Sequence, residues 1–451
     1  MNVSPGDSSS SGGVSLLGAM AIGIGGMVGG GIFAVLGLAT VLAGGATPLA
    51  FLIGGGVALL TAYSYARLSV AFPSSGGTII FIDKAFGINW CTGSANNLLW
   101  IGYVLTLALY AVAFGNYAAT FLPQGQHTVL ASKLLVSLGI LAPTLINLFS
   151  AKIVARSETL VVVLKLAILV LVVVFGFGSI DPSRLAPATW KPLVQVASAG
   201  MIIFVAYEGF ELIANTAASV RNYRTTLPRA YYGSVLVVIV LYVLIAMVVV
   251  GSLPADRIAA AQDFALAEAA TPSLGQLGFT LVGLTAVLAT FSAINSTLYG
   301  AARLSYSIAT EGELPVALEH KVWNQPVGLL LTAGAALLLA ISVDLASIST
   351  MASASFLMIF ALVNLANFRT AREIGSSRLI ALAGVLACSM ALVALLSHTW
   401  QQRPWRLLGL LGLVGLAVAI EGSYVLFLRE TGRTRRVAHP DKRAASRKPT
   451  D

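Results

Sequence analysis

The stretch GIGGMVGGGIF, Gly23–Phe33, decides how this chain folds. Six of the nine residues from 23 to 31 are glycine, although they lie inside an apolar run as long as a membrane helix. An interior glycine costs a helix about 1 kcal/mol relative to alanine, so the cluster costs roughly 6 kcal/mol. The glycines either allow close helix packing or let the helix open and expose its backbone to a buried site. Three consecutive glycines cannot all face one partner helix, which favours the break.

Membrane-helix composition extends over nearly the whole chain. Of the 451 residues, 57% are hydrophobic and 10% are charged, against about 25% charged in soluble domains. The apolar runs do not alternate as the strands of a membrane barrel would. We therefore expect an all-α integral membrane protein with 12 transmembrane helices. The expected spans are 14–43, 47–72, 91–121, 129–149, 158–179, 194–219, 230–252, 277–308, 327–343, 346–368, 378–399 and 406–428.

Two polar segments flank the expected membrane domain, which covers 14–428. Residues 1–13 lack the basic start of a signal peptide and residues 429–451 are basic, so we interpret both as disordered tails. With the N-terminus inside, 20 of the 27 Lys and Arg residues fall on the cytoplasmic side and six on the outer side. This bias predicts a multi-pass protein of the cell membrane with both termini cytoplasmic. Membrane lipid, rather than nucleic acid, is the simpler partner of the basic tail.

The residues that enzymes use show no catalytic pattern. Cys91 and Cys388 lie far apart, and none of the four histidines stands at metal-binding spacing from another ligand. The sequence has no nucleophile elbow, phosphate loop or metalloprotease motif. We expect neither an enzyme nor a bound cofactor or metal.

Two carboxylates interrupt the sixth span, in FVAYEGFELIAN (204–215). Glu208 and Glu211 flank Gly209 in apolar surroundings, where a carboxylate costs a few kcal/mol and indicates a functional site. The alternative is that both glutamates satisfy amides at a helix break. Either interpretation requires a break in span six. Spans one and six are each the first span of a five-helix half. An inverted-repeat transporter would have breaks in both of these corresponding spans.

Lys165 interrupts the fifth span. The side chain can snorkel toward the cytoplasmic interface, because helical side chains tilt toward the N-terminus. Alternatively, it is a desolvated lysine that carries a proton. The residues alone leave both interpretations open.

Polar residues of span eight fall on one helix face that could line a cavity. They are spaced i, i+3, i+4 and i+7. Hydroxyls and amides are also common in contacts between membrane helices, so the second interpretation is interhelical hydrogen bonding. The residues are Ser292, Asn295, Ser296 and Tyr299.

The chain from about Leu16 to Leu428 resembles the amino acid permeases of the amino acid–polyamine–organocation superfamily. The resemblance rests on the order and spacing of five motifs. It is closest to prokaryotic proton-coupled members of broad specificity, which carry a lysine where Lys165 stands. The motifs are MVGGGIF (27–33), DKAFG (83–87), AYEGFE (206–211), LPRA (227–230) and YGAARLSYSIATEGELP (299–315).

The resemblance implies a five-plus-five inverted repeat with discontinuous helices 1 and 6, plus two extra C-terminal helices. Repeat one would cover about 14–179, repeat two about 194–368, and the extra helices about 378–428. Family members that pair with a glycoprotein use a cysteine in the loop after span three. The loop here, LPQGQHTV, has none, so no disulfide-linked partner subunit is expected.

The resemblance also implies a substrate site at the two breaks. Amides of span one would hold the substrate carboxylate, carbonyls of span six would hold its ammonium group, and an aromatic pocket would surround its side chain. The expected amides are those of Val28, Gly29, Gly30, Gly31 and Ile32. The expected carbonyls are those of Val205, Ala206 and Glu208. Tyr103, Phe356 and Asn295 are further expected pocket members. Position 205 is valine where several relatives have an aromatic gate, so the gate here is either Phe204 or Tyr207, or it is reduced.

The expected proton-coupling site centres on Lys165, beside the carbonyl of Gly25. A serine partner in span eight is replaced by Ala289, which leaves Thr290 or Ser292 to assist. Glu211 is the rival proton carrier. Glu208 stands where close relatives usually have an apolar residue, so either its backbone alone matters or its side chain biases the pocket toward cationic or polar substrates.

The sequence thus predicts a secondary active transporter that takes up amino acids with protons by alternating access. The alternatives are an amino acid or polyamine exchanger of the same fold, and a membrane sensor that binds amino acids without transporting them. Sodium coupling is disfavoured because an ammonium group and a sodium ion cannot share one site.

Overall fold

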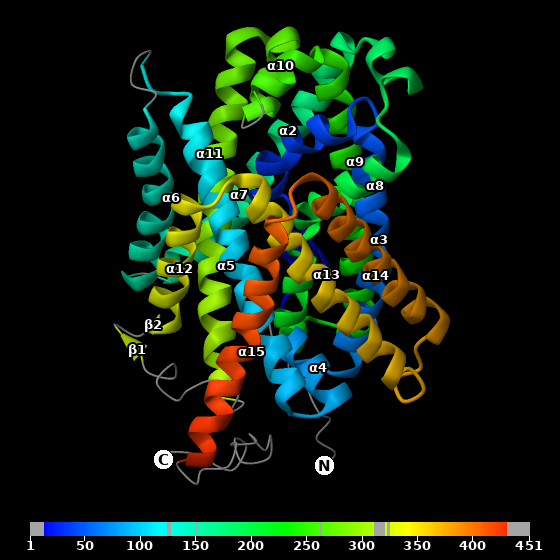
Figure 1. Ribbon diagram of the computed structural model, residues 1–451, viewed down its shortest axis with the longest axis vertical. Coiled ribbons are helices and arrows are strands. Elements are labelled where there is room, and N and C mark those ends of the chain that lie inside the picture. The colour runs from blue at the N-terminus through cyan, green and yellow to red at the C-terminus, as the bar shows by residue number, and fades with distance from the viewer. Residues whose placement is uncertain are drawn as a thin grey trace, which may run out of the picture.

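The computed structural model describes residues 13–123, 128–149, 151–261, 264–310, 321–322 and 325–430. The expected tails therefore lie almost entirely outside the described residues, as does the end of the motif at 299–315. The described chain is helical apart from one antiparallel pair of two-residue strands (Figure 1). The α-helices and strands are α1 (Leu16–Met27), α2 (Gly31–Ala43), α3 (Thr47–Ala71), α4 (Thr78–Phe86), α5 (Trp90–Ala119), α6 (Val129–Phe149), α7 (Ala151–Gly176), α8 (Leu193–Ile202), α9 (Tyr223–Ser252), α10 (Ala255–Ala260), α11 (Ala265–Thr310), β1 (Lys321–Val322), β2 (Gln325–Pro326), α12 (Gly328–Ser342), α13 (Leu345–Thr370), α14 (Arg378–Gln402) and α15 (Arg406–Glu430).

Apolar length and composition make most of these helices candidate membrane spans. Within the described residues, nine helices are long and apolar enough to cross a membrane, and two bent pairs, α1 with α2 and α8 with the 3-10 segment Phe204–Ser219, raise the number to 11. The remaining expected span, 327–343, corresponds to α12, which has 15 residues. A straight span needs about 20 residues, so α12 as a twelfth span stays a prediction.

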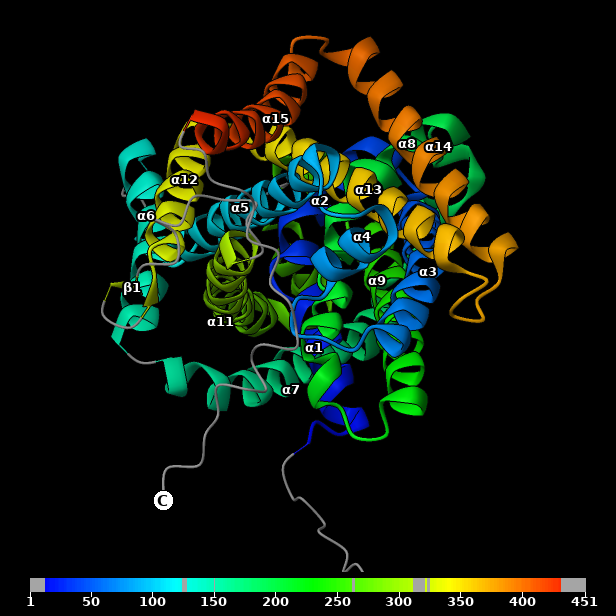
Figure 2. The same ribbon diagram turned by 90° about the horizontal axis from the view of Figure 1, so that it is seen from below.

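The helices divide into a buried centre and a periphery. An apolar 18-residue stretch of α5 is 100% buried, whereas the corresponding stretches of α6, α14 and α15 are 28% buried. Figure 2 shows α14 and α15 along one edge of the bundle and α6 on another. Large apolar side chains cover these peripheral helices, including Leu379 and Leu408, which are 77% and 69% exposed. Such surfaces require lipid rather than water around them.

Corresponding spans of the two expected halves pack against each other. α3 packs against α9, α5 against α11, and α1 against the 3-10 helix η5 (Phe210–Ser219). In terms of span numbers, two meets seven, three meets eight, and one meets six. An inverted repeat would make these pairings, and the repeat itself remains a prediction.

Several local structures differ from the sequence expectation. α4 and α10 were not expected, because helices of 9 and 6 residues are too short for hydropathy to reveal. α11 begins 12 residues before the expected span at 277. It contains Pro272, and its backbone turns at Gly275 with φ +60°. The positive φ explains the kink, because glycine adopts it without steric cost.

Candidate functional site

The two broken spans cross where two glycines meet. α1 and α2 are bent by 46°, and α8 and the segment Phe204–Ser219 by 53°. A Cβ atom at Gly26 would lie 2.8 Å from the Cα of Gly209, and Gly209 itself has φ +125°. Side chains rarely adopt that φ, so glycine is required where the two backbones touch. The break expected from the glycine cluster is confirmed, and so is the break in span six.

Side chains of neighbouring spans bond to the backbone that the breaks release. The hydroxyl of Tyr242, in α9, donates to the carbonyls of Met27 at 2.6 Å and Ala206 at 3.1 Å, which joins the two breaks. The hydroxyl of Ser353, in α13, accepts from the Val205 amide at 3.0 Å and donates to the Ile202 carbonyl at 2.8 Å. In a membrane interior such groups have no water to bond, so these side chains stabilise the breaks.

Fewer amides of span one remain available to a ligand than expected. The amides of Val28 and Gly29 bond to carbonyls of α1, at 2.8 and 3.2 Å. No side chain caps α2, whose cap residue is Gly30 and whose first residues are Gly31 and Ile32. The first amides of a helix have no partner within it and attract an anion. Of the five expected amides, those of Gly30, Gly31 and Ile32 therefore remain available to an anion, and their role in binding a carboxylate stays a prediction.

Both glutamates of span six are buried and bonded to α5. Thr106 donates its hydroxyl to the Glu208 carboxylate at 2.7 Å, and Tyr103 donates to Glu211 at 3.2 Å. Glu211 also accepts the Gly209 amide at 2.7 Å. Within the described part of the chain neither carboxylate forms an ion pair. Glu211 thus serves the break, as one alternative held, whereas Glu208 accepts only a side-chain hydroxyl among the described residues.

Lys165 lies beside the first break. Its side chain is buried, and its Nζ donates to the Gly25 carbonyl at 2.9 Å. The snorkelling interpretation is therefore wrong, because the amino group reaches the centre of the bundle instead of the interface. Of the expected assistants on α11, Thr290 donates its hydroxyl to the Ala286 carbonyl at 2.6 Å, and Ser292 is half-buried. The contact with Gly25 is the expected one, and the coupling role stays a prediction.

Aromatic rings from three helices surround the breaks. Tyr103 packs edge-on against Phe356 with ring centroids 5.7 Å apart, and Phe204 packs against Phe360 at 5.9 Å. All four rings are buried, so the site is closed to solvent in this structure. Tyr207 points elsewhere, because its hydroxyl donates to a backbone carbonyl of α3 at 2.7 Å. Of the two expected gate residues, Phe204 therefore lies among the aromatic rings of the site.

Asn295 forms a contact between two helices. Its side-chain oxygen accepts the amide of Asn147 at 2.5 Å, which joins α11 to α6. For this residue the geometry favours interhelical hydrogen bonding, the second interpretation of the span-eight polar face.

Comparisons with known proteins agree with this architecture. A sequence model of the family described as amino acid permease matches residues 14–419. The chain belongs to this family. An uncharacterized protein of Methanocaldococcus jannaschii is 36% identical over 86% of this chain and 89% of its own. The inner membrane transport protein YbaT of Escherichia coli is 34% identical over 89% of this chain and 94% of its own.

A more distant relative carries a more specific name. The serine/threonine exchanger SteT of Bacillus subtilis is 25% identical over 67% of this chain and 69% of its own. The family is one of transporters, not of enzymes, and this permease is a multi-pass membrane protein that transports small molecules.

Three residues of this permease's site carry no clear signal in the sequence. Tyr242, Ser353 and Thr106 bond to the broken backbone or to Glu208. Tyrosine, serine and threonine are ordinary in membrane helices, so nothing in the sequence distinguishes these three from residues that pack. Tyr103 and Thr106 are three residues apart and therefore lie on one helix face. Once the glutamates were known, this spacing was the one sequence feature that could have indicated Thr106 as a partner of Glu208.

Proposed function

We propose that this permease takes up amino acids together with protons by alternating access. The observation that carries the proposal is the crossing of two broken helices beside a buried lysine and two buried carboxylates. Broken helices that meet at the membrane centre bring backbone groups of both signs to one point. A zwitterionic α-amino acid matches such a point, since it carries one group of each sign.

The substrate backbone would be bound by main-chain atoms. The amides of Gly30, Gly31 and Ile32 would bind the carboxylate at the start of α2. The carbonyls of Val205 and Ala206 would accept the substrate ammonium, because each keeps a lone pair beside the bond it already accepts. Tyr103, Phe204 and Phe356 would enclose the side chain.

Proton coupling would use Lys165. A protonated amino group holds the Gly25 carbonyl, which ties α7 to the end of α1. Loss of the proton removes the charge from this bond and weakens the tie, since charge-assisted hydrogen bonds are about twice as strong as neutral ones. Breaking and remaking the tie would link proton movement to the movement of the first span.

Transport assays on the purified chain test the proposal. We would measure uptake of 20 radiolabelled amino acids, one at a time, into proteoliposomes with pH and sodium gradients imposed separately. The proposal predicts accumulation of at least one amino acid with an inward proton gradient and none driven by sodium alone. Uptake that follows only the sodium gradient, or no uptake of any amino acid, would contradict it.

A second candidate function is exchange, including exchange of cationic substrates or polyamines. Two observations favour it. One relative is named an exchanger, and Glu208 presents a second buried carboxylate in the site, without an ion pair among the described residues. Counterflow would separate the candidates, because an exchanger accumulates label without any pH gradient when unlabelled substrate is inside.

The arrangement in the cell is also part of the proposal. The membrane domain would cover 14–428 in the cell membrane, with repeats at about 14–179 and 194–368 and both termini in the cytoplasm. The permease would act with its substrate, protons and lipid as partners and with no cofactor, metal or disulfide-linked subunit.

A further inference from the structure

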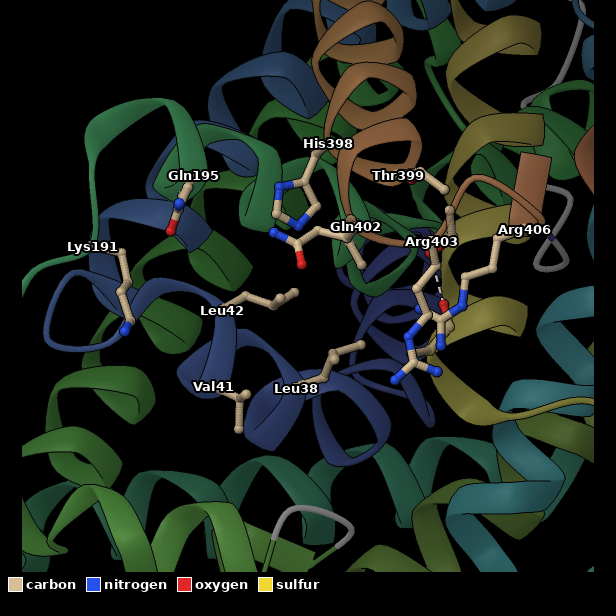
Figure 3. Close-up of a pocket in the computed structure, with 13 residues that line it drawn as sticks. Leu38, Val41, Leu42, Lys191, Gln195, His398, Thr399, Gln402, Arg403 and Arg406 are labelled. Carbon is tan, nitrogen blue, oxygen red and sulfur yellow. Dashed lines mark hydrogen bonds between the residues drawn. The ribbon is translucent and has the colours of Figure 1, made fainter.

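A cavity of about 310 Å³ opens beside the break in span six (Figure 3). It lies where α2 and α14 end and where α8, α13 and α15 begin, on the side that the charge bias predicts to be outside. Its floor includes Leu38 and Ile202, which are both buried, and its rim includes the exposed side chains of Gln402 and Arg403. The cavity is large enough for a small organic molecule.

Three basic residues line this cavity. Lys191 lies on one side of it, and Arg403 and Arg406 lie close together on the other (Figure 3). The two arginines flank the short connection between α14 and α15. The Arg406 amide donates to the Arg403 carbonyl at 3.0 Å, and this bond holds the two backbones close together. Two like charges held side by side repel, and an anion between them relieves that repulsion.

One carboxylate neutralises one of these charges. Asp344 accepts a hydrogen bond from Arg406 at 2.8 Å. Partial burial alone would raise the pKa of Asp344, but hydrogen bonds from Ser347 and the charges of Arg406 and Arg403 lower it below its ordinary value, so Asp344 stays ionised. Within the described residues neither Lys191 nor Arg403 forms an ion pair. The cavity therefore keeps two positive charges that its own acidic neighbour does not balance.

Neutral hydrogen-bonding groups complete the wall. Gln195, His398, Thr399 and Gln402 line the same cavity, and Figure 3 shows Gln195, His398 and Gln402 grouped between Lys191 and the arginines. Fixed positive charge with adjacent donors is the environment that binds a carboxylate, and an arginine can bind one through two parallel bonds.

The cavity also adjoins the break in span six. Ile202, part of the floor, is the last residue of α8, and its carbonyl accepts hydrogen bonds from Ser349 and Ser353 at 2.8 Å each. Ser353 also bonds the Val205 amide on the other side of the break. Ile202 and Ser353 therefore link the cavity to the proposed substrate site.

We propose that this cavity is an outer binding site for a carboxylate group, where an amino acid is captured before it enters the site at the breaks. The identity of the captured molecule as an amino acid rests on the proposed function. The carboxylate chemistry rests on the cavity alone, so the two can be tested separately.

Charge-selective thiol modification tests the site without any transport. The variant Gln402→Cys, in a Cys91→Ser background, provides one accessible thiol in the cavity, since Cys388 is buried. The thiol attacks a methanethiosulfonate reagent, a mixed disulfide forms, and methanesulfinate leaves. Reagents that carry a sulfonate or a trimethylammonium group report the local charge. Each reagent's rate with the cavity thiol is divided by its rate with a free thiol. We expect this normalised rate to be about tenfold higher for the sulfonate reagent than for the trimethylammonium reagent.

Removing the charges gives the decisive comparison. In Lys191→Gln/Arg403→Gln the rate ratio should fall toward that of free thiol, whereas the matched variant Lys133→Gln/Arg257→Gln, which removes two outer charges elsewhere, should keep it. Sodium acetate should slow modification more than sodium chloride at equal ionic strength. An unchanged ratio in the first variant, or equal effects of the two salts, would overturn the proposal.

Transport measurements then connect the site to the substrate. For the radiolabelled amino acid with the highest uptake among the 20, Lys191→Gln/Arg403→Gln should raise KM severalfold and leave the maximal rate unchanged. An unchanged KM overturns the capture role even if the cavity binds acetate. If no amino acid is transported by the parent, the proposed function fails while the thiol measurements still decide whether the carboxylate site exists.

Discussion

Lys165 reaches the carbonyl of Gly25 from α7, and its Nζ donates to that carbonyl at 2.9 Å. A shorter or neutral side chain leaves that carbonyl without its charged donor. Replacing Lys165 therefore tests its role, because a lysine that only stabilises the fold and a lysine that couples the proton predict different results.

We predict that Lys165→Ala folds but loses proton-driven uptake by at least about tenfold, the size of a typical coupling energy between two sites. Counterflow of unlabelled for labelled substrate should be retained better than proton-driven uptake. Proteoliposomes with an imposed pH gradient provide the measurement, and size-exclusion profiles in detergent provide the folding control. Normal pH-dependent uptake by the variant would assign the proton to Glu211 instead. In that case Glu211→Gln should abolish proton-driven uptake.

Glu208 is the residue for which we expect the clearest effect on substrate specificity. Its carboxylate is buried and accepts one hydroxyl, from Thr106. We predict that Glu208→Gln, which keeps the shape and removes the charge, raises KM for cationic substrates such as lysine or putrescine by about thirtyfold or more, since losing one partner of a buried charge pair costs about 2–5 kcal/mol. KM for neutral amino acids should change little.

The comparison with Thr106→Val makes the charge effect specific. That variant removes the hydrogen bond and keeps the carboxylate, so it should disturb both substrate classes alike. An equal increase in KM for neutral and cationic substrates in Glu208→Gln would mean that the carboxylate only accepts the Thr106 hydrogen bond and does not select substrates by charge.

Sequence reasoning reached the chemically unusual residues and missed the ordinary ones. Lys165, Glu208 and Glu211 were found because an ionisable group in an apolar span requires an explanation. Tyr242 and Ser353 were missed because their hydroxyls become informative only when the released carbonyls and amides are located in space.

At the scale of elements, the glycine cluster determines where two helices break and cross. Gly26 and Gly209 bring the backbones of spans one and six into contact. The ends of the same two spans that the charge bias predicts to be cytoplasmic are also joined, since the Val14 amide donates to the Ser219 carbonyl at 2.8 Å and the Val14 carbonyl accepts from the Arg221 amide at 3.0 Å. The two broken spans are therefore linked at their centre and at one end, as a pair that moves together would be.

We predict that Gly26→Ala destabilises the protein by about 1–3 kcal/mol, the usual cost of overpacking, because the new Cβ would lie 2.8 Å from the Cα of Gly209. Thermal unfolding in detergent should show a lower midpoint, and uptake should fall. Gly56→Ala is the matched control, because a Cβ there meets nothing within 4 Å on α3. The control should be neutral or more stable, since alanine favours the helix by up to about 1 kcal/mol.

An unchanged or higher midpoint for Gly26→Ala would contradict the prediction, because it would show that helix propensity, and not the close crossing with Gly209, governs this position. The expectation of a break came from glycine density alone. The partner of each glycine could not be derived, because contact between residues 26 and 209 depends on the packing of the whole bundle.

At the scale of the whole molecule, hydropathy located the long spans but missed the short helices and the extension that precedes one span. α4, α10 and the extension of α11 before residue 277 are short or interrupted by Pro272 and Gly275, so a window of about 20 residues averages them away. Orientation depends on charge instead, and the charge bias is strong.

We predict that green fluorescent protein fused after Asp451 fluoresces and that alkaline phosphatase fused there is inactive, because the first folds in the cytoplasm and the second outside it. The structure provides a matched site at the other end of the bundle. Alkaline phosphatase inserted at Ser183, in the exposed segment between α7 and α8, should be active. The reasons are the 20 basic residues assigned to one side and the arrangement in Figure 1, where α15 ends near α4 and away from α10. The reverse pattern of activities would invert the whole molecule in the membrane, and the cavity with Lys191 and Arg403 would then face the cytoplasm.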